Sequence, residues 1–214
     1  MSVKISILLI ILFGAFLAIN AQTPAVGVKF SIVNGLATYL PKPEYSQEAK
    51  DFCASGTVSV KVEINEKGDV SSAETIVGDE LLRDSSIEAA KKAKFRVTRN
   101  KGQAVKVKGI IVYNFPAEKK CITVGIVNKR AKLIPKPEFP KSCRCQGRVV
   151  LEIIVEPNGS VIKARALSGH PLLRDSAVKS ALATTFSPIP ITTQPIYVRA
   201  QMVFDFSADG KVGF

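Results

Sequence analysis

The chain of 214 residues lacks tryptophan and contains a single histidine, His170. One imidazole cannot supply the several histidines of most catalytic zinc sites, and no Gly-x-Ser-x-Gly motif marks a hydrolase nucleophile. Long glycine-rich or proline-rich stretches are missing as well, which excludes a fibrous or low-complexity protein. We therefore expect a globular, non-enzymatic protein that uses no metal and no cofactor.

Acidic residues are scarce, because 18 Asp and Glu face 30 Lys and Arg and leave a formal charge of +12. Residues 22–117 hold 14 basic and 11 acidic side chains, a net charge of +3, whereas residues 118–214 hold 15 and 7, a net charge of +8. Such a basic surface could face anionic lipid, lipopolysaccharide or peptidoglycan. The alternative is a surface that is basic without any specific partner, since net charge governs solubility and loose association.

Only one long apolar run is present, and it lies at the start of the chain. Lys4 precedes 13 apolar or glycine residues, Ile7 to Ile19, and the small residue Ala21 follows. This pattern is typical of a secretory signal peptide over residues 1–21, which would leave the mature chain periplasmic or secreted. An uncleaved inner-membrane anchor over residues 5–19 is the alternative, although 13 helical residues span only about 20 Å of a core about 30 Å thick. Export and the lack of a recognisable motif exclude nucleic acid as a partner.

Cysteines are few and even in number: Cys53, Cys121, Cys143 and Cys145. In an exported protein we expect all four to form disulfides, whereas a zinc site lacks the usual Cys-x-x-Cys spacing. A bridge from Cys121 to Cys143 or Cys145 would close a loop of about 22–24 residues. Cys53 would then pair with the remaining cysteine and tie the two halves of the chain together. A Cys143–Cys145 bond is not expected, because cysteines two apart close a small strained ring.

Two sequence blocks occur twice. Residues 32–44 recur at 126–138 with eight of 13 positions identical, and residues 78–86 recur at 169–177 with six of nine identical. The offset is 94 residues in the first block and 91 in the second, so three residues are lost between them. Two units of about 90 residues indicate two domains rather than a solenoid.

Each unit shows one order of elements, and we assign domain 1 to residues 22–117 and domain 2 to residues 118–214. In domain 1, apolar residues alternate from Val58 to Ile64, Gly68 follows in a turn, and a second strand runs to Val77. A helix and a long closing strand complete the unit, and domain 2 repeats this order with its turn at Pro157-Asn158-Gly159. The order strand–strand–helix–strand predicts an α+β fold, in which one helix packs on an antiparallel three-stranded sheet.

Two local features flank this unit in domain 1. Asp84 or Ser85 is expected to cap the helix, since Ser85 and Glu88 fit a capping box. Before the first strand, Asn34-Gly35 predicts the type I′ turn of a small hairpin, and the prolines of Pro41-Lys42-Pro43 then hold the chain extended.

Neither of two polar features is expected to bind a ligand. His170 has Asp79 as its counterpart in the repeat, so its imidazole does not belong to a shared site. The recurring pairs Arg83-Asp84 and Arg174-Asp175 are expected to be local ion pairs.

Taken in order, these features resemble the C-terminal domain of TonB, the periplasmic energy transducer of Gram-negative bacteria. The shared features are the Pro-Glu-Tyr/Phe entry, the Gly-x-Val pairs, the Gly-x-x-Leu-Leu-Arg-Asp blocks and the aromatic closing strands. They occur twice, over residues 41–115 and 135–206. The resemblance implies two tandem domains of this kind that bind envelope proteins, among which an outer-membrane transporter is a candidate partner linked to transport across that membrane.

A small sheet has two edges, and an extended peptide can add to either one through backbone hydrogen bonds. We expect partners at the closing strand of each sheet or at its opposite edge, and we expect the closing strands to be unpaired on their outer side. Val112 and Val203 are expected to bond inward. The edge residues predicted for partner binding are Val105, Val107, Val112, Tyr113, Phe115, Ile196, Val198, Val203, Phe204 and Phe206. The alternative function is a structural or scaffolding protein that holds peptidoglycan or lipid on its basic surface, without energy transduction.

Overall fold

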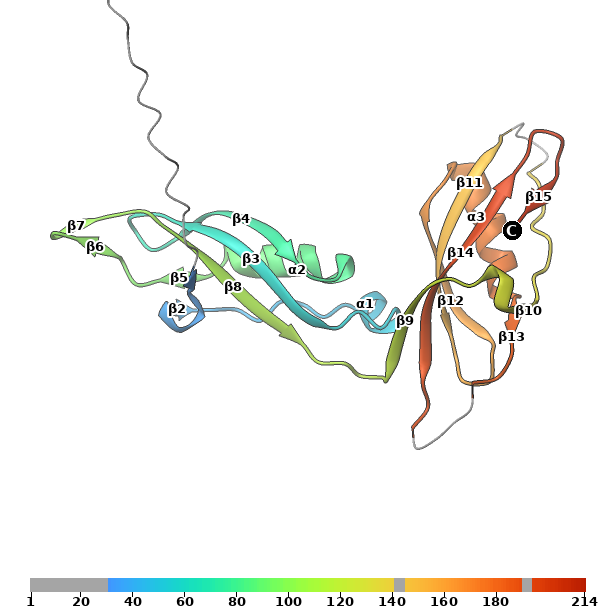
Figure 1. Ribbon diagram of the computed structural model, residues 1–214. Coiled ribbons are helices and arrows are strands. Elements are labelled where there is room, and N and C mark those ends of the chain that lie inside the picture. Colours follow the sequence, from blue (N-terminus) through green and yellow to red (C-terminus); the bar gives the residue numbers. More distant parts are fainter. Residues whose placement is uncertain (1–30, 141–144, 190–193) are drawn as a thin grey trace, which may run out of the picture.

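The computed structural model describes residues 31–140, 145–189 and 194–214, which form two units joined through residues 116–120 (Figure 1). The predicted leader, the alternative anchor over residues 5–19 and Cys143 lie outside the described residues. Within the described part of the chain, no helix is long and apolar enough to cross a membrane.

Domain 1 is a small sheet with one long helix on one face (Figure 1). Its central strand β3 (Gly56–Ile64) pairs antiparallel with β4 (Val70–Val77) on one side and with β8 (Val107–Phe115) on the other. Helix α2 (Glu80–Lys91) connects β4 to the closing strand and packs on β3 and β4. This arrangement confirms the predicted α+β fold. The short elements are β1 (Ser31–Ile32), η1 (Asn34–Leu36), β2 (Ala37–Tyr39), α1 (Gln47–Asp51), β5 (Lys94–Phe95), β6 (Arg99–Asn100) and β7 (Gln103–Ala104).

Domain 2 repeats this plan. Strand β11 (Gly147–Val155) lies between β12 (Val161–Ser168) and β14 (Tyr197–Phe206), and α3 (Pro171–Leu182) packs on β11 and β12. Strand β9 (Cys121–Ile126) and strand β15 (Val212–Gly213) pair with β14 and extend the sheet to five strands. The remaining elements are η2 (Asn128–Arg130), β10 (Ala131–Leu133) and β13 (Thr185–Phe186).

The cores explain why these residues form these elements. Along β3, Val58, Val60 and Val62 are fully buried under the helix, while the residues between them are only partly covered. Helix α2 turns Leu82, Ala89 and Ala90 toward the sheet, the spacing of an amphipathic helix. The central strand of domain 2 differs, because Glu152 and Ile154 are buried along with Leu151 and Ile153 on the other face. Both faces of β11 are therefore covered, one of them by domain 1, as shown below.

The two predicted hairpin turns are confirmed. Gly68 has φ +87° and Gly159 has φ +93°, a backbone conformation that favours glycine. A side chain at either position would also collide with a backbone carbonyl, since an added Cβ would lie 2.1 Å from the Phe95 oxygen or 2.3 Å from the Phe186 oxygen.

The predicted helix cap is wrong. Helix α2 begins five residues earlier than expected, and its N-cap is Asp79, whose carboxylate accepts a hydrogen bond from the Leu81 amide at 3.1 Å. His170 holds the same place before α3, and its Nδ1 accepts from the Leu172 amide at 3.3 Å. Asp79 and His170 thus share a structural role despite their different chemistry.

The predicted hairpin around Asn34-Gly35 is wrong as well. Strand β1 pairs in parallel with β8, and β2 pairs with β5, so the two strands do not pair with each other. Between them, residues Asn34–Leu36 form a short 3-10 helix. The reason is long-range, because the side chain of Asn34 bonds to the backbone of Val112 and so holds this segment beside β8.

Candidate functional site

The predicted edge residues lie where the sequence placed them along the chain. Val107 to Phe115 form β8 and Val198 to Phe206 form most of β14, while Val105 and Ile196 lie just before these strands. The side chains of Tyr113, Phe115, Phe204 and Phe206 are buried in the two cores. These four side chains are therefore not available to a partner.

The outer side of β14 is not free, contrary to our expectation. Strand β9 pairs with it in parallel over residues 197–201, and the Val127 amide donates to the Gln201 carbonyl at 3.0 Å. Asn128 then bonds to Val203, and β15 pairs with Asp205 and Phe206. The lead-in segment of the repeat thus acts as an additional strand, which apolar alternation in the sequence did not reveal.

The outer side of β8 is covered in the same way as far as Val112. Strand β1 pairs with Gly109 and Ile110, and Asn34 spans Val112: its Nδ2 donates to the Val112 carbonyl at 2.7 Å, and its Oδ1 accepts from the Val112 amide at 2.9 Å. Asn128 makes the matching pair of bonds to Val203, at 2.8 and 2.9 Å. We call Asn34 and Asn128 the asparagine clamps.

The asparagine clamps correct a further prediction. Because they bond to Val112 and Val203 from outside, these two residues bond outward and not inward. The sequence did contain a signal for the clamps: both asparagines stand in the recurring Ile-Val-Asn motif.

The opposite edges, at β4 and β12, have no neighbouring strand among the described residues. Backbone groups of a strand point alternately to its two sides. Because Val112 and Val203 bond outward, their register partners Ser59 and Val150 bond toward β4 and β12, and so do Lys61 and Glu152 two residues further along. Their partners Glu74 and Arg165 therefore bond inward, and the outward amides are those of Ala73 in β4 and Ala164 in β12. These two strands offer unpaired backbone groups to an added peptide.

The cysteines connect the two domains. Cys53, just after α1, is bonded to Cys121 at the start of β9, with 6.2 Å between the two Cα atoms. The expected bridge from Cys121 to Cys143 or Cys145 is therefore wrong. Cys121 is the first residue of β9, directly after the segment that connects the domains, and this position holds it beside Cys53 of domain 1. Cys145 is also disulfide-bonded.

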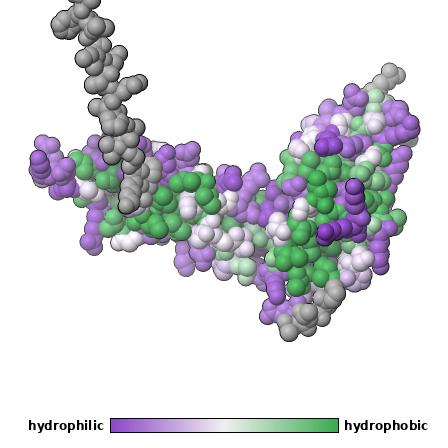
Figure 2. All heavy atoms as spheres, in the orientation of Figure 1, coloured by the Kyte–Doolittle hydropathy of each residue, from purple (hydrophilic) through white to green (hydrophobic). Residues whose placement is uncertain are grey.

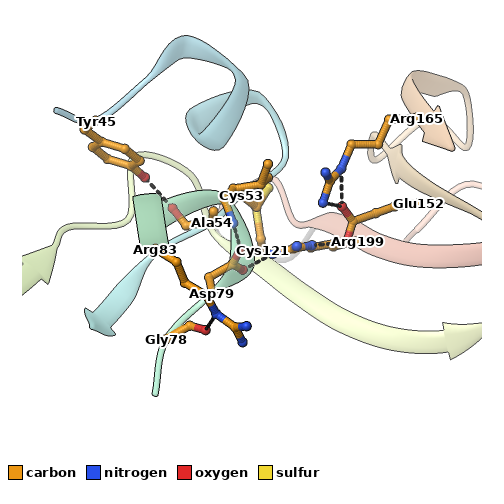
Figure 3. Close-up of polar contacts among 11 residues, drawn as sticks. Tyr45, Cys53, Ala54, Gly78, Asp79, Arg83, Cys121, Glu152, Arg165 and Arg199 are labelled. Atoms are coloured by element: carbon orange, nitrogen blue, oxygen red, sulfur yellow. Dashed lines mark hydrogen bonds and ion pairs between the residues drawn. A yellow bond between two sulfur atoms is a disulfide. The ribbon is translucent and has the colours of Figure 1, made fainter. Parts of the chain in front are cut away.

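Charged side chains surround this disulfide and form what we call the junction network (Figure 3). Arg199 of β14 pairs with Asp79, the N-cap of α2, and donates from Nε to Glu152 at 2.6 Å. Arg165 donates to the other oxygen of Glu152 at 2.8 Å, and its guanidinium lies 5.2 Å from the centre of the Phe52 ring. Burial opposes the charge on Arg199, but its hydrogen bonds to Asp79 and Glu152 outweigh burial and raise the pKa of this guanidinium.

Further contacts extend the junction on both sides. Lys163 pairs with Asp51 of α1 at 2.7 Å, and Lys50 pairs with Glu118 of the connecting segment at 2.8 Å. The outer face of the domain 2 sheet thus receives α1 and the start of α2. This contact explains the burial of Glu152, a charged residue on the face of β11 that lies away from α3.

The recurring arginines have a structural role. Arg83 donates from Nε to the Gly78 carbonyl at 3.1 Å, and Arg174 donates to the Gly169 carbonyl at 2.9 Å. Each fixes the chain before its helix, and neither forms the ion pair we expected with the neighbouring aspartate. No group of three or more potential metal ligands occurs in the described part of the chain.

These features define an α+β protein with two tandem domains, in which unpaired backbone groups lie at the edges of the sheets. The family follows from a comparison with known families: the model of the Gram-negative bacterial TonB protein C-terminal domain matches residues 41–116 and again 135–208. The chain belongs to this family, carries its domain twice and is a TonB-like envelope protein. No curated protein matches the chain.

Proposed function

We propose that this protein is exported to the periplasm and binds an extended segment of an envelope protein by strand addition at the outer edges of β4 and β12. The observation that supports this site is the lack of a neighbouring strand at these edges among the described residues. Strand addition supplies affinity through backbone hydrogen bonds, so it needs no pocket on this protein.

The closing strands take a secondary part in this proposal. The outer side of β8 beyond Val112, at Asn114, is a third place where a short segment could add, because β1 and the asparagine clamp stop before it. On β14 a partner strand would first have to displace β9. An outer-membrane transporter is the partner class that the family suggests, and binding to it would link the protein to transport across that membrane.

Paired variants test the site. Proline at Ala73 and Ala164 removes the outward amides and leaves the bonds to β3 and β11 in place, so the fold should persist. The matched controls Ala73→Ser and Ala164→Ser keep both amides. The mature chain and its variants would be crosslinked in an envelope extract, and captured proteins identified by mass spectrometry.

We expect the wild-type chain and the serine variants to capture the same outer-membrane protein, and the doubly proline-substituted chain to lose it while keeping its far-UV circular dichroism. Equal capture by the folded proline variant would refute strand addition at β4 and β12. In that case the end of β8 would be the next edge to block.

The net charge of +8 on residues 118–214 favours a second candidate, a scaffolding protein that holds peptidoglycan or anionic lipid. Cosedimentation with purified peptidoglycan at low and high salt tests it. Because exposed charges are screened by salt, binding that depends on this surface should fall as ionic strength rises.

A further inference from the structure

Domain 2 contains a cavity of about 310 Å³ at the end of its sheet that α3 leaves uncovered. Ile122 and Val124 of β9 form one wall, and Val155, Val198 and Ala200 form the floor. Phe186 of β13 closes a further side. The lead-in strand that we had not expected thus forms one side of a pocket at the lower end of the volumes typical of small-molecule sites.

The pocket wall is apolar except at two residues. Ser187 is one, and Arg130, at the end of η2, is the single charged residue of the lining. Arg130 is exposed and has no ion-pair or side-chain hydrogen-bond partner among the described residues. A guanidinium of this kind is suited to a carboxylate or a phosphate, which it can bind through two parallel hydrogen bonds.

The backbone around the pocket argues against a peptide as the occupant. The outward groups of β14 are already bonded to β9 and Val127, so a peptide in this place would find few partners for its own amides. A hydrocarbon chain has no hydrogen-bonding groups to satisfy, and burial of its methylenes is favourable in such a site.

On these grounds we propose that domain 2 binds one fatty acyl chain in this cavity, with the anionic head group of the same molecule held by Arg130 at the mouth. The visible face of domain 2 presents hydrophobic and hydrophilic residues side by side (Figure 2). On β9, Ile122 and Ile126 are 45% and 65% exposed, so apolar surface continues outside the cavity.

The site is specific to domain 2. In the repeat, Leu36 stands at the position of Arg130, which removes the cation. Gly109 stands at the position of Ala200, and Val33 packs directly against it, since a Cβ added to this glycine would lie 2.3 Å from a Val33 methyl group. The proposal goes beyond strand addition and does not depend on it, because it concerns a different face of domain 2.

Binding would be measured with the mature chain and a fluorescent fatty acid, which is then displaced by myristate or by methyl myristate. Two variants probe the site: Arg130→Gln removes the cation, and Val124→Phe places a ring in the cavity. Lys129→Gln is the matched control, because Lys129 is the exposed neighbour of Arg130 and does not line the cavity. Circular dichroism checks that each variant is folded.

We expect Arg130→Gln to weaken the displacement by myristate about tenfold and to leave that by methyl myristate unchanged, while Lys129→Gln alters neither. Val124→Phe should abolish both. Failure of the wild-type chain to bind the probe, or equal losses in Arg130→Gln and Lys129→Gln, would overturn the proposal.

The same variants with vesicles of phosphatidylglycerol identify the source of the acyl chain. Loss of vesicle binding in Arg130→Gln but not in Lys129→Gln would assign the site to a membrane lipid. Vesicle binding that is unchanged in Arg130→Gln, together with weakened displacement by myristate, would assign it to a free fatty acid.

Discussion

At the scale of single residues, the side chains of Asn34 and Asn128 replace the backbone hydrogen bonds of a neighbouring strand. A carboxamide carries one donor and one acceptor side by side, so it can bond to the amide and carbonyl of one residue as a neighbouring strand would. Each clamp stops the lead-in segment at a fixed register on the closing strand. An aspartate could not replace it, because a carboxylate only accepts.

Replacing Asn128 with alanine is predicted to destabilise domain 2. The change leaves the amide and the carbonyl of Val203 without their partners, and Asn128 itself is only 7% exposed. We expect a loss of about 1–3 kcal/mol in the free energy of unfolding, measured by urea denaturation. Asn34→Ala in domain 1 is the matched variant. An unchanged midpoint for both would show that water satisfies these groups equally well.

Tyr113 gives a second prediction at this scale. Its hydroxyl is buried and has no hydrogen-bond partner among the described residues, and burial raises its pKa to about 12. The unfolded chain loses this proton near pH 10, whereas the folded chain keeps it. The contribution of Tyr113 to stability is therefore fully present below pH 10 and is lost as the pH rises from about 10 to about 12.

The variant Tyr113→Phe separates this effect from other titrations. It should unfold at the same or a slightly higher urea concentration at pH 7, since it removes a buried polar group that lacks a partner. Between pH 9 and pH 12 its stability should fall less steeply than that of the wild-type chain. Parallel pH profiles for the two proteins would contradict the raised pKa of Tyr113.

At the scale of elements, the two helices have different N-cap residues. Asp79 and His170 occupy the same N-cap position, but carboxylates are among the preferred N-caps and also favour the positive end of the helix dipole. We predict that His170→Asp stabilises domain 2 by about 0.5–1 kcal/mol, measured by urea denaturation. His170→Asn tests the cap without the charge. A loss of stability in both variants would show that the imidazole makes a better cap than either side chain.

The elements that the sequence predicted correctly are those governed by local rules. The alternation in β3, the turns at Gly68 and Gly159 and the position of the closing strands all follow from periodicity or backbone conformation. The lead-in strands were missed because β9 pairs with β14, about 75 residues further along the chain. Apolar periodicity cannot specify such a partner, and a parallel neighbour leaves no turn signature in the sequence.

The candidate site was predictable only in part, for the same reason. That a free sheet edge exists follows from the order of elements, but which edge is free depends on where the lead-in strand pairs. The pairing of Cys121 also depended on this strand. Its loop length pointed to a local bridge, whereas the path of β9 holds it next to Cys53.

At the scale of the whole molecule, the junction joins two similar units through unequal surfaces. Domain 2 contributes the outer face of its sheet, where Arg165 bonds to Glu152. At the corresponding positions of domain 1, Lys61 pairs with Glu74 at 3.7 Å, so the acidic and the basic residue have exchanged places. As a result, Arg165 and Arg199 of domain 2 both bond to the carboxylate of Glu152. Since Asp79 both caps α2 and binds Arg199, the docking of the domains is coupled to the start of a helix.

We predict that the disulfide and the junction network each suffice to keep the domains docked. In Cys53→Ser with Cys121→Ser, the short connection over residues 116–120 still holds Arg199 close to Asp79, so the pair can form. In Arg199→Gln, the disulfide keeps α1 against β9. Only the combined variant loses both restraints, and it should extend about the connecting segment.

Small-angle X-ray scattering would then give the wild-type radius of gyration for the first two proteins and a larger one for the third. Arg148→Gln is the matched control, because it breaks an exposed ion pair with Asp205 and touches no residue of the junction network. A combined variant as compact as the wild-type chain would show that packing of Phe52 and the other ion pairs holds the domains together without either restraint.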